Sequence, residues 1–429
     1  MKFLHKILLG ILIIIYPVFF LLIEFHITPI ISYTEIFITS SLFFIAAGLT
    51  IIKFDVGKKY LILLIGLSIL IRIMFLFVHP IGSDDYYRYV WDGKVQASGI
   101  NPYQYAPDNN ALISLHTKTL PEKINFADMK TIYPPLSEII FYFAYLIGGE
   151  SYIGIKLLLL IFDLLSMTGI FLILKKIKLD FKYLLIYALC PLIIFQFFID
   201  AHLDGFGLPL MVFAIYLFLD NKKIFSYILI GFSICIKPLA IILIPILFFT
   251  EKDFKEKIKI VLIPAFICVI MYLPFVFTGS PFQALIKFTE NWTFNGVVFN
   301  LLDSFIHDNQ RTRLICAVLL FVFYLPVILS KKDLFDKIYL SIFLLFIFSP
   351  VVHPWYLTWL AVLLPFIPRQ SGIVFVGLVS LTVFTVLNYQ LTGNWKEYTP
   401  VLILEYVPVI ILFLRELFDK KNIIMHKSI

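Results

Sequence analysis

The sequence has little charge for its length. Asp, Glu, Lys and Arg make up only 15% of its 429 residues, whereas 61% are hydrophobic. No soluble domain of this size needs so much apolar surface, so the composition indicates a membrane protein. Backbone groups in lipid must be hydrogen-bonded within helices or within a closed barrel. The apolar runs are unbroken and do not alternate as barrel strands do, and they therefore predict α-helices.

Cysteine is also scarce. All four cysteines lie inside apolar runs, and none belongs to a CxxC motif or to a cluster with histidine, so neither a metal site nor a disulfide is predicted. They are Cys190, Cys235, Cys268 and Cys316. The net charge of +7 lies mostly in short loops. This pattern fits membrane orientation better than binding to nucleic acid, so no nucleic-acid partner is expected.

The predicted fold is an all-α polytopic membrane protein with about 14 transmembrane helices. Twelve of them are expected near 7–24, 35–52, 60–79, 152–174, 183–200, 205–219, 258–277, 312–330, 336–350, 354–368, 372–388 and 399–418. The first is interpreted as a helix and not as a cleaved signal, because Glu24 ends it and no small-x-small site follows. Lysines near both ends predict that both termini are cytoplasmic.

Two shorter segments give the remaining expectations. Residues 136–148 would cover only about 20 Å as a helix, so they are interpreted as re-entrant or as lying at the outer face. Residues 224–250 are interrupted by Lys237 and Pro238 and are expected to form two short helices with Lys237 at an outer tip. The chain 1–429 is then a single integral membrane domain. Its parts are a three-helix segment (1–79), a first outer loop (80–135) and the remaining helices (136–429).

A polar stretch, GSDDYYRYVWDG, follows the third apolar run at residues 82–93. If it is helical, Arg88 lies four residues from both Asp84 and Asp92. It lies three residues from Asp85, so the four charges are neighbours on one face. The simpler alternative is a water-facing helix with ordinary surface charges.

The lysine-based topology brings other unusual polar residues to the same outer face. Polar groups near membrane depth are costly and usually mark a substrate path. Each also has a structural alternative: Asp200 and Asp204 as helix caps, Lys237 as a snorkelling lysine, and His353 as a partner of a backbone carbonyl. The residues predicted to bind substrate are Arg88, Trp91, Asp92, Tyr133, His202, Asp204, Lys237, His353, Trp355 and Tyr356.

Acids and bases beside lipid suit the transfer of a group from a lipid-linked donor. An aspartate can take the proton of an acceptor hydroxyl, and a lysine, arginine or histidine can neutralise a leaving phosphate. Tyrosine and tryptophan in the outer loops can stack on sugar rings. The tip that contains Asp200, His202 and Asp204 offers ligand types for a divalent cation. Two carboxylates and one imidazole from one turn are weak evidence for a metal, and none is assigned.

The stretch SDDYYRYVWDGKVQASGINPYQYAP (83–107), followed by TIYPPL (131–136), resembles GT-C glycosyltransferases that use polyprenyl-phosphate sugars. The order of an AHLDG tip, a Lys-Pro break and a final HPWY is similar to bacterial membrane mannosyltransferases and to the GPI mannosyltransferases. The resemblance implies an inverting transfer at the outer face, with Asp84 or Asp85 as the catalytic acid residue. Three helices precede the loop here, and adjacent aspartates replace the DxD of some relatives. The choice of base and the use of a divalent cation therefore stay open.

The predicted function is transfer of a sugar, with mannose implied by the resemblance, from a polyprenyl-phosphate donor to a lipid-linked or surface glycan. The expected location is the cell membrane. One alternative is a transporter or lipid-glycan flippase, although such proteins often show inverted repeats and polar groups at the bilayer midplane. Another is a polysaccharide polymerase or ligase, which would share the location but not the Asp-Asp loop.

Overall fold

The computed structural model describes residues 29–418, so the helix predicted at 7–24 and the terminal lysines lie outside the described residues. Within that range the chain forms helices and turns and contains no β-strand. It divides into two compact units, each drawn from separate parts of the sequence. In the described range, unit 1 contains residues 29–82, 170–196 and 293–418, and unit 2 contains residues 83–169 and 197–292.

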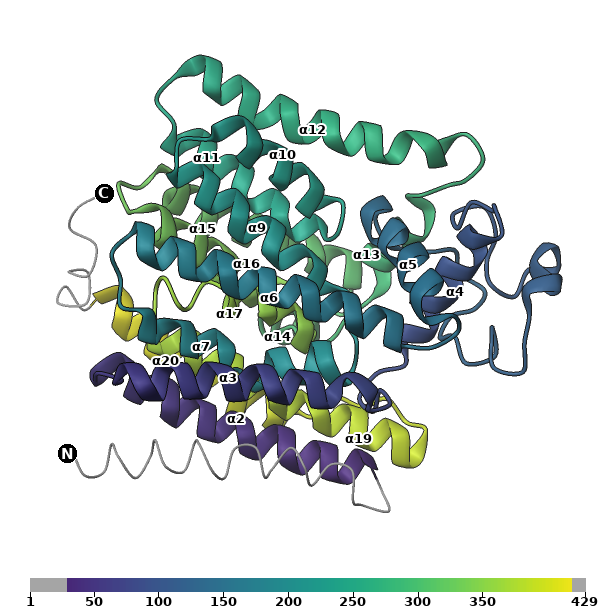
Figure 1. The fold of residues 1–429 in the computed structure, drawn as a ribbon, viewed down its shortest axis with the longest axis horizontal. Coiled ribbons are helices and arrows are strands. Elements are labelled where there is room, and N and C mark those ends of the chain that lie inside the picture. The colour runs from purple at the N-terminus through teal and green to yellow at the C-terminus, as the bar shows by residue number, and fades with distance from the viewer. Residues whose placement is uncertain (1–28, 419–429) are drawn as a thin grey trace. The chain divides into compact units, whose positions relative to one another are not determined.

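Unit 2 carries the polar stretch and the Lys-Pro break. Its α9 and α10 lie side by side, α10 packs on α12, and α4 packs on α5 (Figure 1). Its elements are α4 (Asp85–Ala97), η3 (Asn110–Leu115), α5 (Pro135–Gly148), most of α6 (Ile153–Lys176), the end of η5 (Ile194–Ile199), α9 (Asp204–Leu219), α10 (Lys223–Ile234), η6 (Pro238–Ile242), α11 (Leu243–Thr250), α12 (Phe254–Val276) and α13 (Gln283–Asn291).

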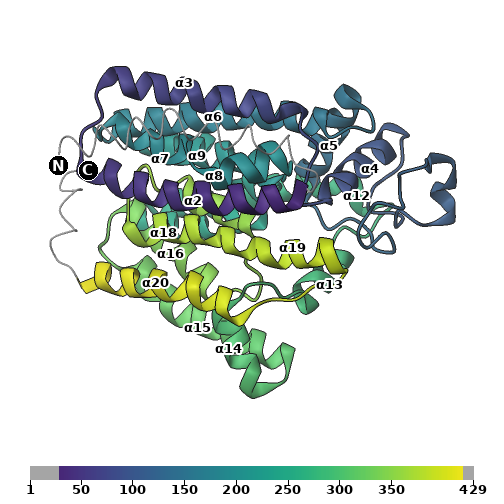
Figure 2. The ribbon, with the colours of Figure 1, turned by 90° about the horizontal axis from the view of Figure 1, so that it is seen from below.

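Unit 1 contains the N-terminal helices and the C-terminal third of the chain. Its α18 packs against both α2 and α20 (Figure 2). Its elements are α2 (Pro29–Lys53), α3 (Lys58–Met74), η2 (Phe75–Phe77), η4 (Phe181–Tyr183), α7 (Leu184–Ala188), α8 (Pro191–Ile193), α14 (Val297–Ile306), α15 (Asn309–Leu329), α16 (Leu334–Phe348), η7 (Pro354–Leu357), α17 (Thr358–Ala361), α18 (Gln370–Leu378), η8 (Val379–Thr382), α19 (Val383–Thr392) and α20 (Thr399–Phe418).

The helices confirm an all-α polytopic membrane protein. Among the described residues, six helical segments are long and apolar enough to cross a membrane, or seven if a pair bent by 46° counts as one span. The six are Pro29–Lys53, Lys58–Phe77, Ile153–Lys176, Phe254–Val276, Asn309–Leu329 and Gln370–Thr392, and the bent pair is Phe181–Ala188 with Pro191–Ile199. Shorter apolar helices accompany them. Because a short helix can be half of a broken span, the count of about 14 stays a prediction.

The break predicted at Lys237 is confirmed. Helix α10 ends at Ile234, and Lys237 has an extended backbone before Pro238 begins η6. Proline lacks a backbone N–H and disfavours helical geometry in the residue before it, so the break follows from the local sequence. The predicted short helix at 136–148 is also present as α5, although its relation to the bilayer is a prediction still.

The segment 278–311, in which the sequence predicts no helix, is partly helical. It contains α13 and α14, two amphipathic helices of nine and ten residues. Both are too short to stand out as apolar runs, and their polar faces resemble loop composition. Length and hydropathy alone therefore missed them.

Candidate active site

The acidic stretch begins a helix, as its spacing predicts. Helix α4 starts at Asp85, and Asp84 occupies the position before it. The Ser83 hydroxyl accepts a hydrogen bond from the backbone N–H of Asp85 at 3.2 Å, which stabilises the first turn. The side-chain amide of Asn125, from the loop between α4 and α5, donates to the Asp84 carboxylate. The two adjacent aspartates therefore have different partners.

Arg88 pairs with one of the three aspartates. Its Nε lies 3.0 Å from both carboxylate oxygens of Asp92, one helical turn further along α4. Its Nη1 donates to the backbone carbonyl of Met129 at 2.9 Å. The arginine is buried, and these contacts tie the outer loop to α4. These contacts support a structural role for Arg88 more directly than a role in binding substrate.

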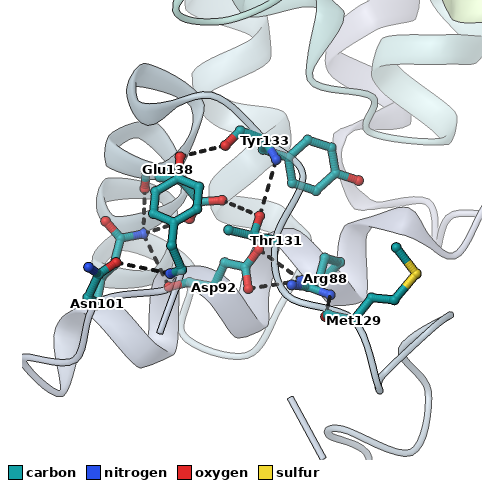
Figure 3. A network of polar contacts seen from close by, with 9 residues as sticks. Arg88, Asp92, Asn101, Met129, Thr131, Tyr133 and Glu138 are labelled. Atoms are coloured by element: carbon teal, nitrogen blue, oxygen red, sulfur yellow. Dashed lines mark hydrogen bonds and ion pairs between the residues drawn. The ribbon is translucent and has the colours of Figure 1, made fainter. Parts of the chain in front are cut away.

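A buried polar network continues from this pair into α5 (Figure 3). The Thr131 hydroxyl donates to Glu138 Oε1 at 2.6 Å, and Gln96 Nε2 donates to Glu138 Oε2 at 3.1 Å. The Tyr103 hydroxyl donates to the backbone carbonyl of Tyr133 at 2.6 Å. The network therefore joins α4, the loop that contains the predicted Tyr133, and α5. Leaving one of these buried groups without its partner would cost about 1–3 kcal/mol.

Burial shapes the protonation of this network. Burial raises the pKa of Asp92, and the positive charge of Arg88 opposes that rise. The same network contains a second buried carboxyl group, Glu138, whose pKa is raised by burial and by the negative charge of Asp92, while the positive charge of Arg88 opposes the rise. Two carboxylates close to one cation favour a shared proton over full ionisation of both.

A second polar cluster gathers around Asp85, at the N-terminal end of α4. His202 Nδ1 lies 3.7 Å from Asp85 Oδ2, and the imidazole is only 1% exposed. In the same unit, Lys237 Nζ forms an ion pair with Asp204 Oδ2 at 3.3 Å. The structure thus brings together residues that are far apart in the sequence. It places Lys237 as an ion-paired residue at the helix break.

The Asp85 carboxyl group is suited to accept a proton near neutral pH. Burial is the largest cause that raises its pKa to about 7, followed by the negative charge of Asp84. The positive charge of Lys237 lowers the pKa, and the buried Asp204 and Asp200 raise it by smaller amounts. The side chain keeps 32% of its surface exposed, so a reactant can reach it. Burial also raises the pKa of Asp84, while the hydrogen bond from Asn125 lowers it.

Sequence reasoning missed several members of these clusters. Asn125, Thr131 and Glu138 carry no local signal of their own, because their roles depend on partners in other elements. Lys156 had such a signal: it is a fully buried charge within the apolar helix α6. Its Nζ lies 4.8 Å from the ring centre of Tyr152, and the charge of Asp200 acts on it. Lys237 was singled out as a charged residue inside an apolar segment, and the same criterion applied to α6 identifies Lys156.

The predicted HPWY residues lie in unit 1 and form an aromatic stack. The His353 ring packs between Phe294, at 4.6 Å, and Trp355, at 4.2 Å, with interplanar angles of 20° and 5°. Tyr356 meets the His353 ring edge-on at 5.5 Å. Backbone bonds from Phe294 N–H to the Pro350 carbonyl and from Val352 N–H to the Phe294 carbonyl hold this turn. The stack leaves Trp355 and Tyr356 partly exposed.

Trp91 packs within unit 2. It is 1% exposed, and its ring lies 5.7 Å from that of His116. This burial gives Trp91 a packing role in the outer loop, and sugar stacking by it stays a prediction from the sequence. Within residues 29–418, no three His, Cys, Asp or Glu side chains are arranged to hold a metal ion.

Two family descriptions match the chain, one after the other along the sequence. Residues 63–251 match the N-terminal domain of a family described as alpha-(1->6)-mannopyranosyltransferase. Residues 293–417 match the family described as the MptB C-terminal domain. No curated protein matches the chain. The first match includes the Asp85 cluster and the Arg88 network, and the second includes the HPWY turn. The chain therefore belongs to the bacterial GT-C-type mannosyltransferases and is a membrane enzyme that transfers mannose.

Proposed function

We propose that the enzyme moves mannose from a polyprenyl-phosphate donor to a glycan acceptor at the outer face of the membrane, with Asp85 as the general base. The observation that carries this proposal is the Asp85 carboxyl group, which has a pKa of about 7 and lies 3.7 Å from the buried His202. General bases work best when their pKa lies near the operating pH.

The reaction is a single displacement at the anomeric carbon of mannose. The acceptor hydroxyl oxygen attacks that carbon while Asp85 takes the hydroxyl proton. The bond from the anomeric carbon to the phosphate oxygen breaks, and both of its electrons leave with the polyprenyl phosphate. One displacement inverts the configuration, so an α-linked product of the kind that the family description names requires a β-linked donor.

The cluster contains a group for each charge that develops. The proton goes to Asp85, and the buried His202 imidazole lies 3.7 Å from that carboxylate. The leaving phosphate gains negative charge, which Lys237 in the same cluster can neutralise. Lys237 is 19% exposed, so its ammonium group is partly open while it is paired with Asp204. Arg88 and Asp92 act one turn away as positioning residues that hold α4.

A lipid-linked donor suits the surroundings of this site. The acidic helix follows directly after membrane helices and is connected to α5, an apolar helix. A donor with a long isoprenoid tail partitions into the bilayer, and its phosphate lies at the interface. A water-soluble sugar nucleotide would gain nothing from this location.

The test is a transfer assay with the purified enzyme in lipid nanodiscs. We expect transfer from polyprenyl-phosphate mannose but not from nucleotide-activated mannose. Asp85→Asn should lower kcat by a hundredfold or more, within the usual range for loss of a general base. Asp84→Asn, a change of the same size one residue away, should retain far more activity. Equal activity of wild type and Asp85→Asn would reject Asp85 as the base.

A further inference from the structure

Unit 2 contains an aromatic cluster that the proposed reaction does not use. It consists of Phe126, from the first outer loop, and Phe288 and Trp292, from the end of α13. The ring centres of Phe126 and Trp292 lie 4.5 Å apart with an edge-to-face angle of 75°. Phe288 stacks on Trp292 at 5.3 Å and 28°. The cluster therefore joins two loops that are more than 150 residues apart in the sequence.

Phe126 is unusual in both backbone and exposure. Its φ angle of 55° lies in the left-handed region, which a bulky residue other than glycine seldom adopts. The residue is nevertheless 54% exposed. An exposed ring gains little from burial, so packing alone does not explain the retention of a strained aromatic residue. Such strain is concentrated at ligand-binding and active sites.

The chain around Phe126 is attached to the catalytic helix on both sides. The preceding residue, Asn125, donates to Asp84. Three residues after Phe126, the carbonyl of Met129 accepts from Arg88, and the N–H of Met129 donates to the carbonyl of Phe126 at 2.9 Å. The backbone of Phe126 is therefore held one residue away from the contact with Asp84.

The segment between α12 and α13 is hydrogen-bonded to the loop that follows α4. The N–H of Ser280 donates to the carbonyl of Tyr103 at 3.1 Å, and Asn101 Nδ2 donates to the carbonyl of Phe275 at 2.8 Å. These bonds hold the chain before α13 against the loop that follows α4, and the contact of Trp292 with Phe126 joins the same two segments at a second point. Contacts within unit 2 thus hold all three rings in place.

We propose that this aromatic cluster is the subsite for the acceptor, where it stacks on a pyranose ring of a neutral glycan. The proposal rests on the proposed function, which supplies the acceptor and the base. Aromatic faces bind the apolar C–H faces of a sugar and offer no charge to a phosphate, so the cluster suits an acceptor sugar better than the donor's phosphate end. A sugar held there would lie beside the acidic end of α4 and present a hydroxyl group toward Asp85.

The test uses two substitutions that each remove an aromatic face. Phe126→Asn keeps a residue that tolerates the left-handed backbone, and Trp292→Leu keeps apolar bulk. Phe282→Ala is the matched control, since Phe282 is a 48% exposed aromatic residue next to α13 whose ring packs against that of Tyr272. Each protein is assayed in nanodiscs with an octyl-linked α-(1→6)-mannotriose as the acceptor probe. Elution volume and thermal unfolding check that each variant is folded.

We expect both variants to raise the KM for mannotriose about three- to tenfold, in line with the loss of an aromatic stacking contact. The donor KM and the kcat at saturating acceptor should stay within twofold, and Phe282→Ala should match the wild type. An unchanged acceptor KM, or an increase in the donor KM alone, would overturn the proposal. Loss of nanodisc incorporation with normal acceptor KM would identify the rings as a membrane anchor and would also overturn it.

A binding measurement separates this inference from the proposed function. Calorimetric titration of mannotriose into the enzyme without donor should show weaker binding by Phe126→Asn than by the wild type. If the wild type transfers no mannose from a polyprenyl-phosphate donor, the proposed function fails and this titration still decides the subsite. If transfer is normal and mannotriose binds both proteins equally, the subsite alone is rejected.

Discussion

The raised pKa of Asp85 predicts how the rate of mannosyl transfer depends on pH. A general base must be ionised to accept a proton. Since the pKa of Asp85 is raised to about 7, kcat/KM should increase about tenfold per pH unit below that value and become constant above it. A carboxylate with an ordinary pKa near 4 would give a constant rate across this range.

Two substitutions should shift this profile in opposite directions. The Asp84 charge raises the pKa of Asp85, so Asp84→Asn should move the acidic limb to lower pH. The Lys237 charge lowers the pKa, so Lys237→Met should move the limb to higher pH. Nearby charges shift a pKa by about 1–3 units when solvent is excluded, and the partial exposure of Asp85 places the expected shifts at about 0.5–1 unit.

The assay is kcat/KM for mannosyl transfer in nanodiscs between about pH 5 and 9, at constant ionic strength. Burial is the largest cause of the raised pKa, so neither variant should restore an ordinary carboxyl value. Asp85→Asn should remove the limb together with most of the activity. Shifts in the same direction for Asp84→Asn and Lys237→Met, or an unchanged limb in both, would refute Asp85 as the titrating base.

Three further predictions concern donor binding, the buried network and topology. Lys237→Met removes the ammonium group that pairs with Asp204 and that we propose neutralises the donor phosphate, so it should weaken donor binding by about 2–5 kcal/mol while acceptor affinity is kept, and normal donor affinity would assign Lys237 a structural role. Glu138→Ala removes the acceptor of two hydrogen bonds and should lower the free energy of unfolding by about 1–3 kcal/mol, as measured by denaturation in detergent. A cysteine at Ile113, in a variant without native cysteines, should react with an impermeant reagent from outside and one at Lys176 should not; the reverse pattern would overturn the predicted orientation.

Much of the helical framework could be predicted because it depends on local properties. Unbroken apolar runs indicate helices in lipid regardless of what they pack against. The break at Lys237 follows from the proline that succeeds it, and the start of α4 follows from a polar stretch with helical charge spacing. The short helices α13 and α14 were missed because nine or ten residues are too few to mark a membrane span.

The partners of the candidate site depended on tertiary structure. Spacing in α4 offered Arg88 three aspartates, and only packing of the loop and α5 shows that Asp92 is its carboxylate partner while Asn125 binds Asp84. His202 lies 117 residues after Asp85, so no local pattern predicts their contact. The sequence by itself therefore determined the membrane class, the helices and the candidate charges. Tertiary structure decided which charges meet and how burial alters their pKa values, because both depend on distances between segments that are remote along the chain.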